Sequence, residues 1–170
     1  MVRILQLKTD ERLLRTPSKE VALSDINTPE IQDVIARMHE ALASQEDGVA
    51  ISAIQIGEPY RIFIISGRAF DIIHDTENGT NRDLVCINPT ITNLSKKKEW
   101  LDEGCLSVRG VYGEVERSEK ATIEAYDIKG NKFTRGGSGL LAQIFQHEYD
   151  HLDGILFIDK ARNLHEHSDE

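Results

Sequence analysis

The segment from Gln146 to His151 carries a His-Glu-x-x-His pattern inside an apolar repeat of helical spacing. His147 and His151 are four residues apart, so on a helix they lie one turn above each other and can bind one metal ion. Glu148 lies beside them, where a carboxylate can accept a proton from water that the metal has made acidic. The pattern predicts a helix with a metal-dependent hydrolytic site; the alternative is a surface helix that carries two histidines without a metal.

Apolar residues extend the same helical face toward the N-terminus of this helix. Ser138 is the predicted N-cap, and Asp153-Gly154 is the predicted end. Leu140 and Ile144 are four residues apart and share the face that carries His147. An apolar wall beside metal ligands is what a pocket for an apolar side chain next to a hydrolysed bond requires.

The length and charge of the chain exclude several classes of protein. A chain of 170 residues fits one domain with a sizeable core. Its formal net charge of −9 argues against nucleic acid or an anionic membrane as a partner. The sequence contains no apolar run of about 18 residues, which a membrane-spanning helix would need, and its first residues lack the pattern of a signal or transit peptide. We therefore expect a cytoplasmic protein.

Two histidines leave a tetrahedral metal short of a third protein ligand, since a hydrolytic site keeps its fourth position for water. The candidates are Cys105, the glutamates that follow the helix, and the tail histidines His165 and His167. The other cysteine, Cys86, lies in an apolar run and is predicted to be a packing residue. A reducing compartment makes a disulfide between the two cysteines the weaker interpretation.

Other segments predict the elements around this helix. Thr28 is a predicted N-cap before Pro29, and an apolar face continues from there to about Ser44. The β-branched run from Arg61 to Ser66 predicts a buried strand. We also expect a surface loop over 67–83, a hairpin of 121–127 with 132–134 that ends at 135–137, and a flexible tail over about 160–170.

The stretch from Gly48 to Gly57 is small and apolar, with one amide, Gln55. Small side chains let another backbone come close, which suits either tight packing or a substrate laid alongside. Taken alone, the stretch favours packing.

Three blocks of the chain together resemble the peptide deformylase family. The first is Gly-Val-Ala-Ile-Ser-Ala-Ile-Gln at 48–55, and the second is Glu-Gly-Cys-Leu-Ser at 103–107. The third is Gln-His-Glu-x-Asp-His-Leu-x-Gly at 146–154. The blocks occur in the order and at the separations typical of that family, and the resemblance extends from Leu14 to about Asp159.

The resemblance implies a metal-dependent amidase that removes the formyl group from the N-terminal formylmethionine of newly made polypeptides and releases formate. Its partners would be N-formylmethionyl nascent peptides, met at the ribosome exit. The implied metal is one Fe(II) ion, with zinc, nickel or cobalt as substitutes, whereas the bare motif alone would indicate zinc. The implied ligands are Cys105, His147 and His151.

The resemblance also implies catalytic groups and a fold. Glu148 would be the general base and acid, and Gln55 and the backbone N–H of Leu106 would donate to the developing oxyanion. Arg117 matches a family arginine, and we expect it to pair with Glu103. The implied fold is α+β, with mixed or antiparallel sheets packed around a central helix that carries the histidine motif. The whole of 1–170 would form a single catalytic domain.

Substrate contacts follow from the same comparison of motifs. Backbone groups around Val49, Ala50 and Gly104 would pair with the substrate as an added strand. Leu140 and Ile144 would line the pocket for the methionine side chain, in agreement with the apolar face found from the helical spacing.

The chain departs from the family pattern at several positions. Ala50 stands where the family usually has glycine, and Ser52 where it usually has alanine. Arg109 stands where many members have proline, and Tyr112 stands where some members have arginine. The added methyl group of Ala50 could narrow the cleft, so a catalytically inactive member or a metal-stabilised binding module is one alternative. A zinc peptidase with a third histidine or glutamate ligand in place of Cys105 is another.

Overall fold

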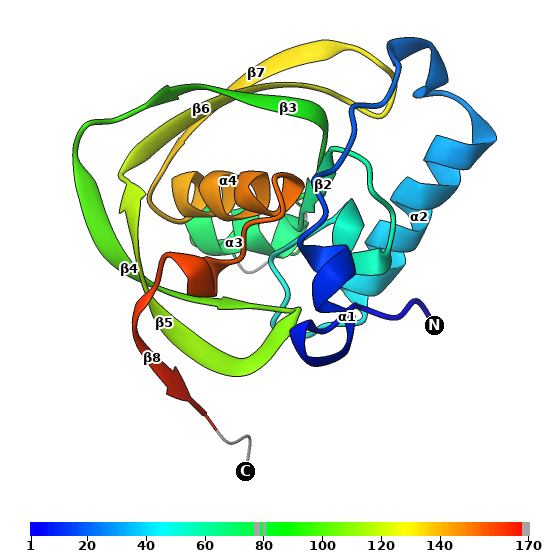
Figure 1. Cartoon of the computed structure of the whole chain (residues 1–170). Helices are drawn as coiled ribbons and strands as arrows, with labels where there is room; N and C mark the ends of the chain where they lie inside the picture. Colours follow the sequence, from blue (N-terminus) through cyan, green and yellow to red (C-terminus); the bar gives the residue numbers. More distant parts are fainter. Residues whose placement is uncertain (77–78, 80, 168–170) are drawn as a thin grey trace.

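The computed structural model describes residues 1–76, 79 and 81–167 (Figure 1). The helices and 3-10 turns are α1 (Leu7–Leu14), η1 (Leu23–Asp25), α2 (Pro29–Ala43), η2 (Ala53–Ile56), α3 (Gly67–His74), α4 (Gly139–Leu152) and η3 (Phe157–Asp159). The strands are β1 (Ala50–Ser52), β2 (Ile62–Ile65), β3 (Leu84–Leu94), β4 (Lys98–Cys105), β5 (Val108–Ser118), β6 (Lys120–Tyr126), β7 (Lys132–Ser138) and β8 (Arg162–Glu166). No helix in the described ranges is both long enough and apolar enough to cross a membrane.

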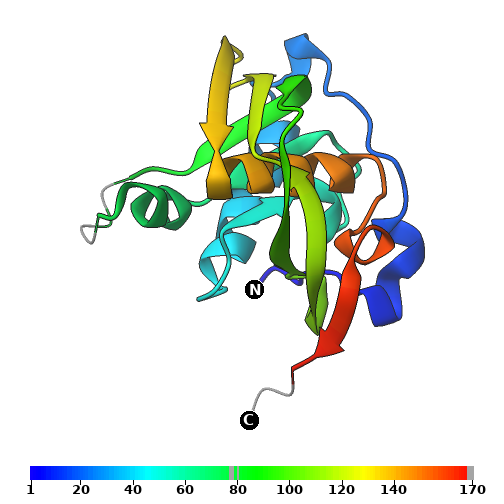
Figure 2. The same ribbon diagram turned by 90° about the vertical axis from the view of Figure 1, so that its left-hand side faces the viewer.

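Two antiparallel sheets surround α4. The larger sheet has the strand order β1-β2-β3-β6-β7, and the smaller one has the order β4-β5-β8. Helix α4 contacts strands of both sheets and lies at the centre of the molecule in both ribbon views (Figures 1 and 2). The expected α+β fold with sheets packed around the motif helix is therefore confirmed.

The burial pattern explains why α4 lies between the sheets. Leu141, Phe145 and Leu152 are buried and pack with Phe63 and Ile123 of the larger sheet. These apolar side chains occupy the helix face next to the one that carries the histidines. The histidine face is therefore turned toward the smaller sheet, where β4 ends at Cys105.

Several predicted elements are confirmed. Helix α2 begins after the N-cap Thr28, whose hydroxyl accepts a hydrogen bond from the backbone N–H of Ile31, and it ends at Ala43. Strand β2 lies inside the predicted range and is buried throughout. The hairpin is formed by β6 and β7, and β6 alternates buried and half-buried residues as its sequence predicts.

The loop prediction over 67–83 was wrong at its beginning, where α3 forms. Ser66 caps this helix by accepting a hydrogen bond from the backbone N–H of Arg68. Ala69 and Phe70 are buried in the core that α4 shares with the larger sheet. Eight residues are too few for a helical period to stand out from the polar residues that follow. Residues 77, 78 and 80 of the predicted loop lie outside the described part.

The predicted end of the hairpin at 135–137 was also wrong, because β7 continues through both glycines to Ser138. A Cβ atom on Gly137 would lie 2.7 Å from Cγ of Leu141, so glycine lets α4 pack closely on this strand. The glycines therefore mark a close approach between elements, which sequence reading mistook for the end of a strand.

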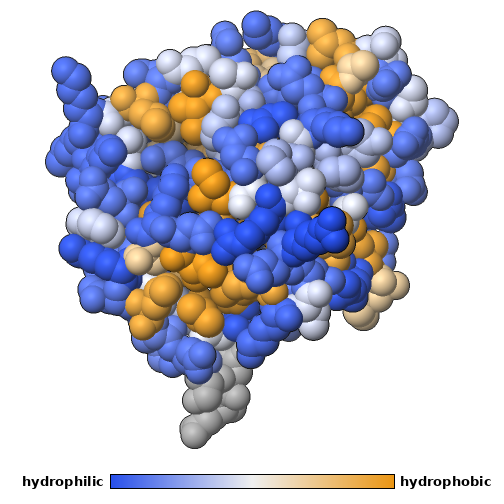
Figure 3. Space-filling model, in the orientation of Figure 1, coloured by the Kyte–Doolittle hydropathy of each residue, from blue (hydrophilic) through white to orange (hydrophobic). Residues whose placement is uncertain are grey.

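The predicted flexible tail was wrong for residues 162–166, which form β8 and pair with β5. The guanidinium of Arg162 lies 3.8 Å from the ring centroid of Trp100, so side chains also join this strand to β4. Figure 3 shows mainly hydrophilic side chains on this face, with apolar ones in several separate patches, the most prominent in its lower half. Strand β8 is exposed and polar, so its sequence resembles that of a tail. Residues 168–170 lie outside the described part.

Candidate active site

The three sequence blocks meet at one cleft. The β1–η2 segment forms one wall, the β4–β5 turn forms a second, and α4 forms the floor. The cleft has a volume of about 410 Å³. Of the predicted site residues, its lining includes Val49, Ala50, Gln55, Gly104, Cys105, Leu106, Leu140, Ile144, His147 and Glu148. His151 lies deeper and is 1% exposed.

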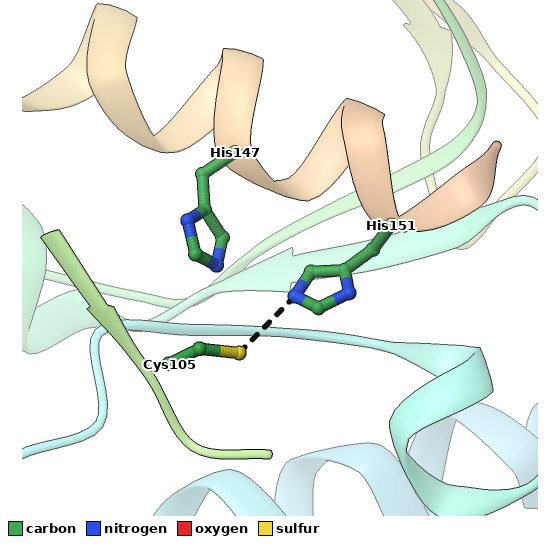
Figure 4. Close-up of side chains that lie close together, drawn as sticks. All are labelled: Cys105, His147 and His151. Carbon is green, nitrogen blue, oxygen red and sulfur yellow. Dashed lines mark hydrogen bonds between the residues drawn. The ribbon is translucent and has the colours of Figure 1, made fainter. Parts of the chain in front are cut away.

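Cys105, His147 and His151 form a compact group of potential metal ligands. One donor atom from each lies within 4.8 Å of the others, and Sγ of Cys105 lies 3.3 Å from Nε2 of His151. Both histidine rings extend from the same side of α4 toward Cys105 on β4 (Figure 4). Bonds of 2.0–2.3 Å to one tetrahedral ion place its ligand atoms about 3.3–3.7 Å apart. The soft thiolate and the two imidazoles therefore suit a divalent transition metal.

The ionisation of the two histidines differs. Burial, reinforced by neighbouring His147, holds the pKa of His151 well below its usual range, so this imidazole is neutral. Burial also disfavours the charged form of His147, but hydrogen bonds to Cys105 and Glu103 raise its pKa. A ligating imidazole must be neutral, so metal binding at His147 would release a proton. Nδ1 of His151 is a buried atom without a hydrogen-bond partner in the described part of the chain.

A buried network orients His147. Its Nδ1 lies 2.5 Å from Oε1 of Glu103, and Glu103 accepts two hydrogen bonds from Arg117, at 2.6 and 3.1 Å. Arg117 also donates to Asp150 at 2.7 Å. The expected pairing of Arg117 with Glu103 is confirmed. Such partners fix the ring orientation of a metal-binding histidine, so that its other nitrogen, Nε2, is the one available for a metal.

The charge of Glu103 is held in place by this network. Burial would raise the pKa of this carboxyl group, but the hydrogen bonds from His147 and Arg117 outweigh burial and lower the pKa to about 2. The sequence motif drew attention to Cys105 and left its neighbour with only a structural role. The signal that could have indicated a partner for His147 was an acidic residue, Glu103, two positions before the proposed ligand Cys105.

Glu148 is buried beside the histidines. Its Oε2 has no hydrogen-bond partner within the described ranges, and burial raises its pKa to about 7, an effect that His147 partly offsets. A carboxyl group with a pKa near neutrality can both accept and return a proton. A cation bound nearby would lower this pKa again, which favours the base form.

Gln55 brings an amide to the same place. Its Nε2 lies 3.7 Å from Sγ of Cys105 and donates to Oγ of Ser107 at 3.0 Å. Its Oε1 accepts hydrogen bonds from the backbone N–H and the hydroxyl of Ser52. Leu106 follows Cys105 directly, and its carbonyl accepts from the side chain of Gln6. The roles of these two serines were not identified from the sequence. The bond with Ser52 is local but was overlooked inside a block that was read for its motif, and the bond with Ser107 joins two blocks that lie 52 residues apart.

The cleft also has a close approach that requires glycine. A Cβ atom on Gly104 would lie 2.8 Å from Cε1 of Tyr112, so the tyrosine ring lies against the backbone there. Arg109 reaches across the cleft to Asp47, with Nη1 3.1 Å from Oδ2, and to the side-chain oxygen of Gln45. The two family departures after the second block thus both form part of the cleft lining.

Comparisons of the sequence with a family model and with known proteins agree on one family. The family model described as "Polypeptide deformylase" matches residues 1–167. Peptide deformylase 2 of Gloeobacter violaceus is 38% identical over 153 residues, which cover 90% of this chain and 76% of that protein. Peptide deformylase 1B, chloroplastic/mitochondrial, of Arabidopsis thaliana is 36% identical over 148 residues, 87% of this chain. The chain spans only 50% of the length of this plant relative.

A solved structure agrees with these sequence relatives. The peptide deformylase of Synechococcus elongatus, crystallised in complex with actinonin, aligns with a TM-score of 0.82 at 34% identity and covers 95% of this chain and 81% of its own. The chain therefore belongs to the peptide deformylase family of hydrolases, which remove the N-formyl group from nascent peptides.

Proposed function

We propose that this chain hydrolyses the formyl amide of N-formylmethionyl peptides with the residues that line the cleft. The observation that carries the proposal is the convergence of three metal-ligand side chains, a buried carboxyl group and an amide donor on one cleft. Cys105, His147 and His151 would hold one divalent ion. Such an ion supplies Lewis acidity, which polarises a carbonyl oxygen and makes water acidic near neutral pH.

Glu148 would move the proton during the reaction. It would accept a proton from the attacking water and return it to the amide nitrogen as the carbon–nitrogen bond breaks. The oxygen of the water stays on the formyl carbon, which leaves as formic acid. That acid ionises to formate, and the released amino group takes up its proton as an ammonium, so atoms and charge balance. Burial disfavours the charged form of this carboxyl group, which helps it to give the proton back. A cation bound nearby would favour the charged form, which accepts the proton.

Two hydrogen-bond donors would stabilise the charge that develops on the formyl oxygen. One is Nε2 of Gln55, which already faces Cys105, and the other is the backbone N–H of Leu106. Fixed donors in a buried place cost little reorganisation during the reaction. Removing one such donor typically lowers kcat by about 10²–10³-fold.

The substrate would lie along the open edge of β1. Among the residues that the structure describes, β1 has a strand partner only on the β2 side. Backbone groups around Val49 and Ala50 can therefore pair with a peptide, as can those of Gly104 on the facing wall. Leu140 and Ile144 of α4 line the same cleft and would contact the methionine side chain.

We further propose Fe(II) as the physiological metal, with zinc, nickel or cobalt as substitutes, and the whole of 1–170 as a single catalytic domain. The cytoplasm and the ribosome exit stay predictions for where the chain meets its substrates. Metal analysis of protein purified anaerobically from its own host would test the first proposal. Cosedimentation with translating ribosomes would test the last.

The deciding experiment measures formate release from formyl-Met-Ala-Ser by anaerobically prepared, Fe(II)-loaded protein. We expect turnover that Glu148→Ala abolishes while the variant keeps one metal per chain. Glu20→Ala, which removes an exposed carboxylate far from the motif helix in sequence, should match the wild type.

Other outcomes would favour the alternatives. No turnover by wild-type protein with one bound metal would indicate an inactive member, and Ala50→Gly would then be the next variant to assay. Full metal retention by Cys105→Ala would favour a peptidase-like ligand set. The position of Cys105 beside His151 argues against that set.

A further inference from the structure

The side chain of Gln55 is held at both ends by buried groups. Oε1 accepts hydrogen bonds from the backbone N–H of Ser52 at 2.9 Å and from its hydroxyl at 3.0 Å. At the other end, Nε2 donates to Oγ of Ser107 at 3.0 Å. Ser52 and Ser107 are 0% exposed and Gln55 is 1% exposed, so water cannot substitute for these bonds.

These bonds leave the amide only one orientation. The oxygen of Gln55 accepts two hydrogen bonds, whereas an amide NH₂ in its place would face the N–H of Ser52, which cannot accept a hydrogen bond. The NH₂ group must therefore point toward Ser107 and Cys105. One of its two hydrogens is donated to Oγ of Ser107, and the other to Sγ of Cys105, which lies 3.7 Å away at the cleft.

We propose that Ser52 is a positioning residue for the reaction, which acts through Gln55 without touching the substrate. Its hydroxyl provides a second hydrogen bond to Oε1 and so keeps the N–H of Gln55 that faces Cys105 aimed at the place where the formyl oxygen becomes negatively charged. The inference rests on the proposed role of Gln55. It adds that the aim of this donor depends on a hydroxyl group on β1.

The expected consequence is a loss of kcat without a loss of substrate binding. A donor that acts mainly in the transition state changes kcat and leaves KM nearly unchanged. Ser52→Ala keeps the backbone N–H bond and removes only the hydroxyl. We expect kcat for formyl-Met-Ala-Ser to fall about fivefold, which corresponds to about 1 kcal/mol at 1.36 kcal/mol per tenfold change in rate, with KM within about twofold of the wild type.

Ser18→Ala is the matched control. Ser18 is also buried, and its Oγ has no hydrogen-bond partner in the described part of the chain. Removing this hydroxyl tests the general effect of emptying a small polar space in the core. We expect the control to keep both kcat and KM, and both variants should retain one metal per chain.

A double-mutant cycle separates positioning from any independent effect of Ser52. Gln55→Ala should lower kcat strongly, and adding Ser52→Ala to it should cause no further loss, because the group that Ser52 positions is gone. A second readout does not depend on turnover. In zinc-loaded protein, the side-chain NH₂ of Gln55 should exchange its hydrogens with solvent faster in Ser52→Ala than in Ser18→Ala, as measured by NMR.

The outcomes are distinguishable. A normal kcat in Ser52→Ala, or its full fivefold loss repeated on top of Gln55→Ala, would overturn the inference and leave the proposed function intact. A normal kcat in Gln55→Ala would remove Gln55 from the mechanism, and the inference with it. Ser52 would be established as a positioning residue if Ser52→Ala lowered kcat at unchanged KM only when Gln55 is present, and if the amide of Gln55 exchanged faster in that variant.

Discussion

At the scale of single residues, Glu103 connects the smaller sheet to the proposed metal ligands. Its carboxylate joins His147 to Arg117, and all three side chains are shielded from water. Glu103→Gln keeps the shape of the side chain and removes its charge, so Arg117 stays buried with less compensation. We expect metal affinity to fall about 10–100-fold and the free energy of unfolding to drop by about 2–4 kcal/mol.

Competition titration with a chelating dye would measure the affinity, and urea unfolding would measure the stability. Glu99→Gln, an exposed position on the same strand, is the matched control and should change neither quantity. Unchanged metal affinity in Glu103→Gln would show that His147 is oriented without this carboxylate.

The lowered pKa of Glu103 also predicts a dependence of stability on pH. Its folded pKa of about 2 lies below the value of about 4.3 for an unfolded glutamate. The stabilisation is therefore fully present above about pH 5 and is lost as the pH falls toward the folded pKa. In metal-free protein, the stability difference between wild type and Glu103→Gln should shrink as the pH is lowered from about 5 to 3. Urea unfolding across this range would measure the stability difference between the two proteins. A difference that stays constant with pH would contradict a stabilised carboxylate at Glu103.

At the scale of elements, the contact between β7 and α4 depends on the absence of a side chain. Gly137→Ala would place a methyl group 2.7 Å from Cγ of Leu141, whereas Gly136→Ala would meet only Oγ1 of Thr122 at an ordinary 3.6 Å. We expect Gly137→Ala to lower the free energy of unfolding by about 1–3 kcal/mol and Gly136→Ala to change it far less. Equal urea midpoints for the two variants would contradict a tight contact at this position.

The elements also show what sequence reading can and cannot reach. Helices α2 and α4 were predictable because each is long and periodic and begins after a residue type that favours N-caps, although only Thr28 of α2 makes a side-chain cap hydrogen bond. Helix α3 is too short for a period to appear, and β8 is defined by pairing with β5, which lies far away in the sequence. The same limit applies within the cleft. A local motif indicated His147 and His151, whereas the partnership of Glu103 with His147 spans 44 residues and becomes visible only in the fold.

At the scale of the whole molecule, the proposed metal joins the central helix to the smaller sheet. A ligand that binds only the folded state stabilises it, by about 2.7 kcal/mol at a hundred times its dissociation constant. We therefore expect Tm to fall when a chelator removes the metal and to recover when zinc is added. Cys105→Ala should lose most of this metal-dependent change in Tm, and Glu148→Ala should keep it, because only the first removes a proposed ligand. Thermal scans with and without the chelator would measure this change. A Tm that does not change with the chelator would show that the metal does not stabilise the fold.

Strand β1 is three residues long and forms one edge of the larger sheet. A peptide that lay beside this edge would pair through its backbone N–H and C=O groups, which are the same in every polypeptide. Pairing there therefore cannot distinguish one substrate sequence from another. Selection would then fall on the first side chain alone, through the apolar wall on α4. An edge this short also offers little on which a neighbouring molecule could build a sheet. A single feature would thus let one enzyme serve a whole proteome of differing substrates while keeping its own copies apart.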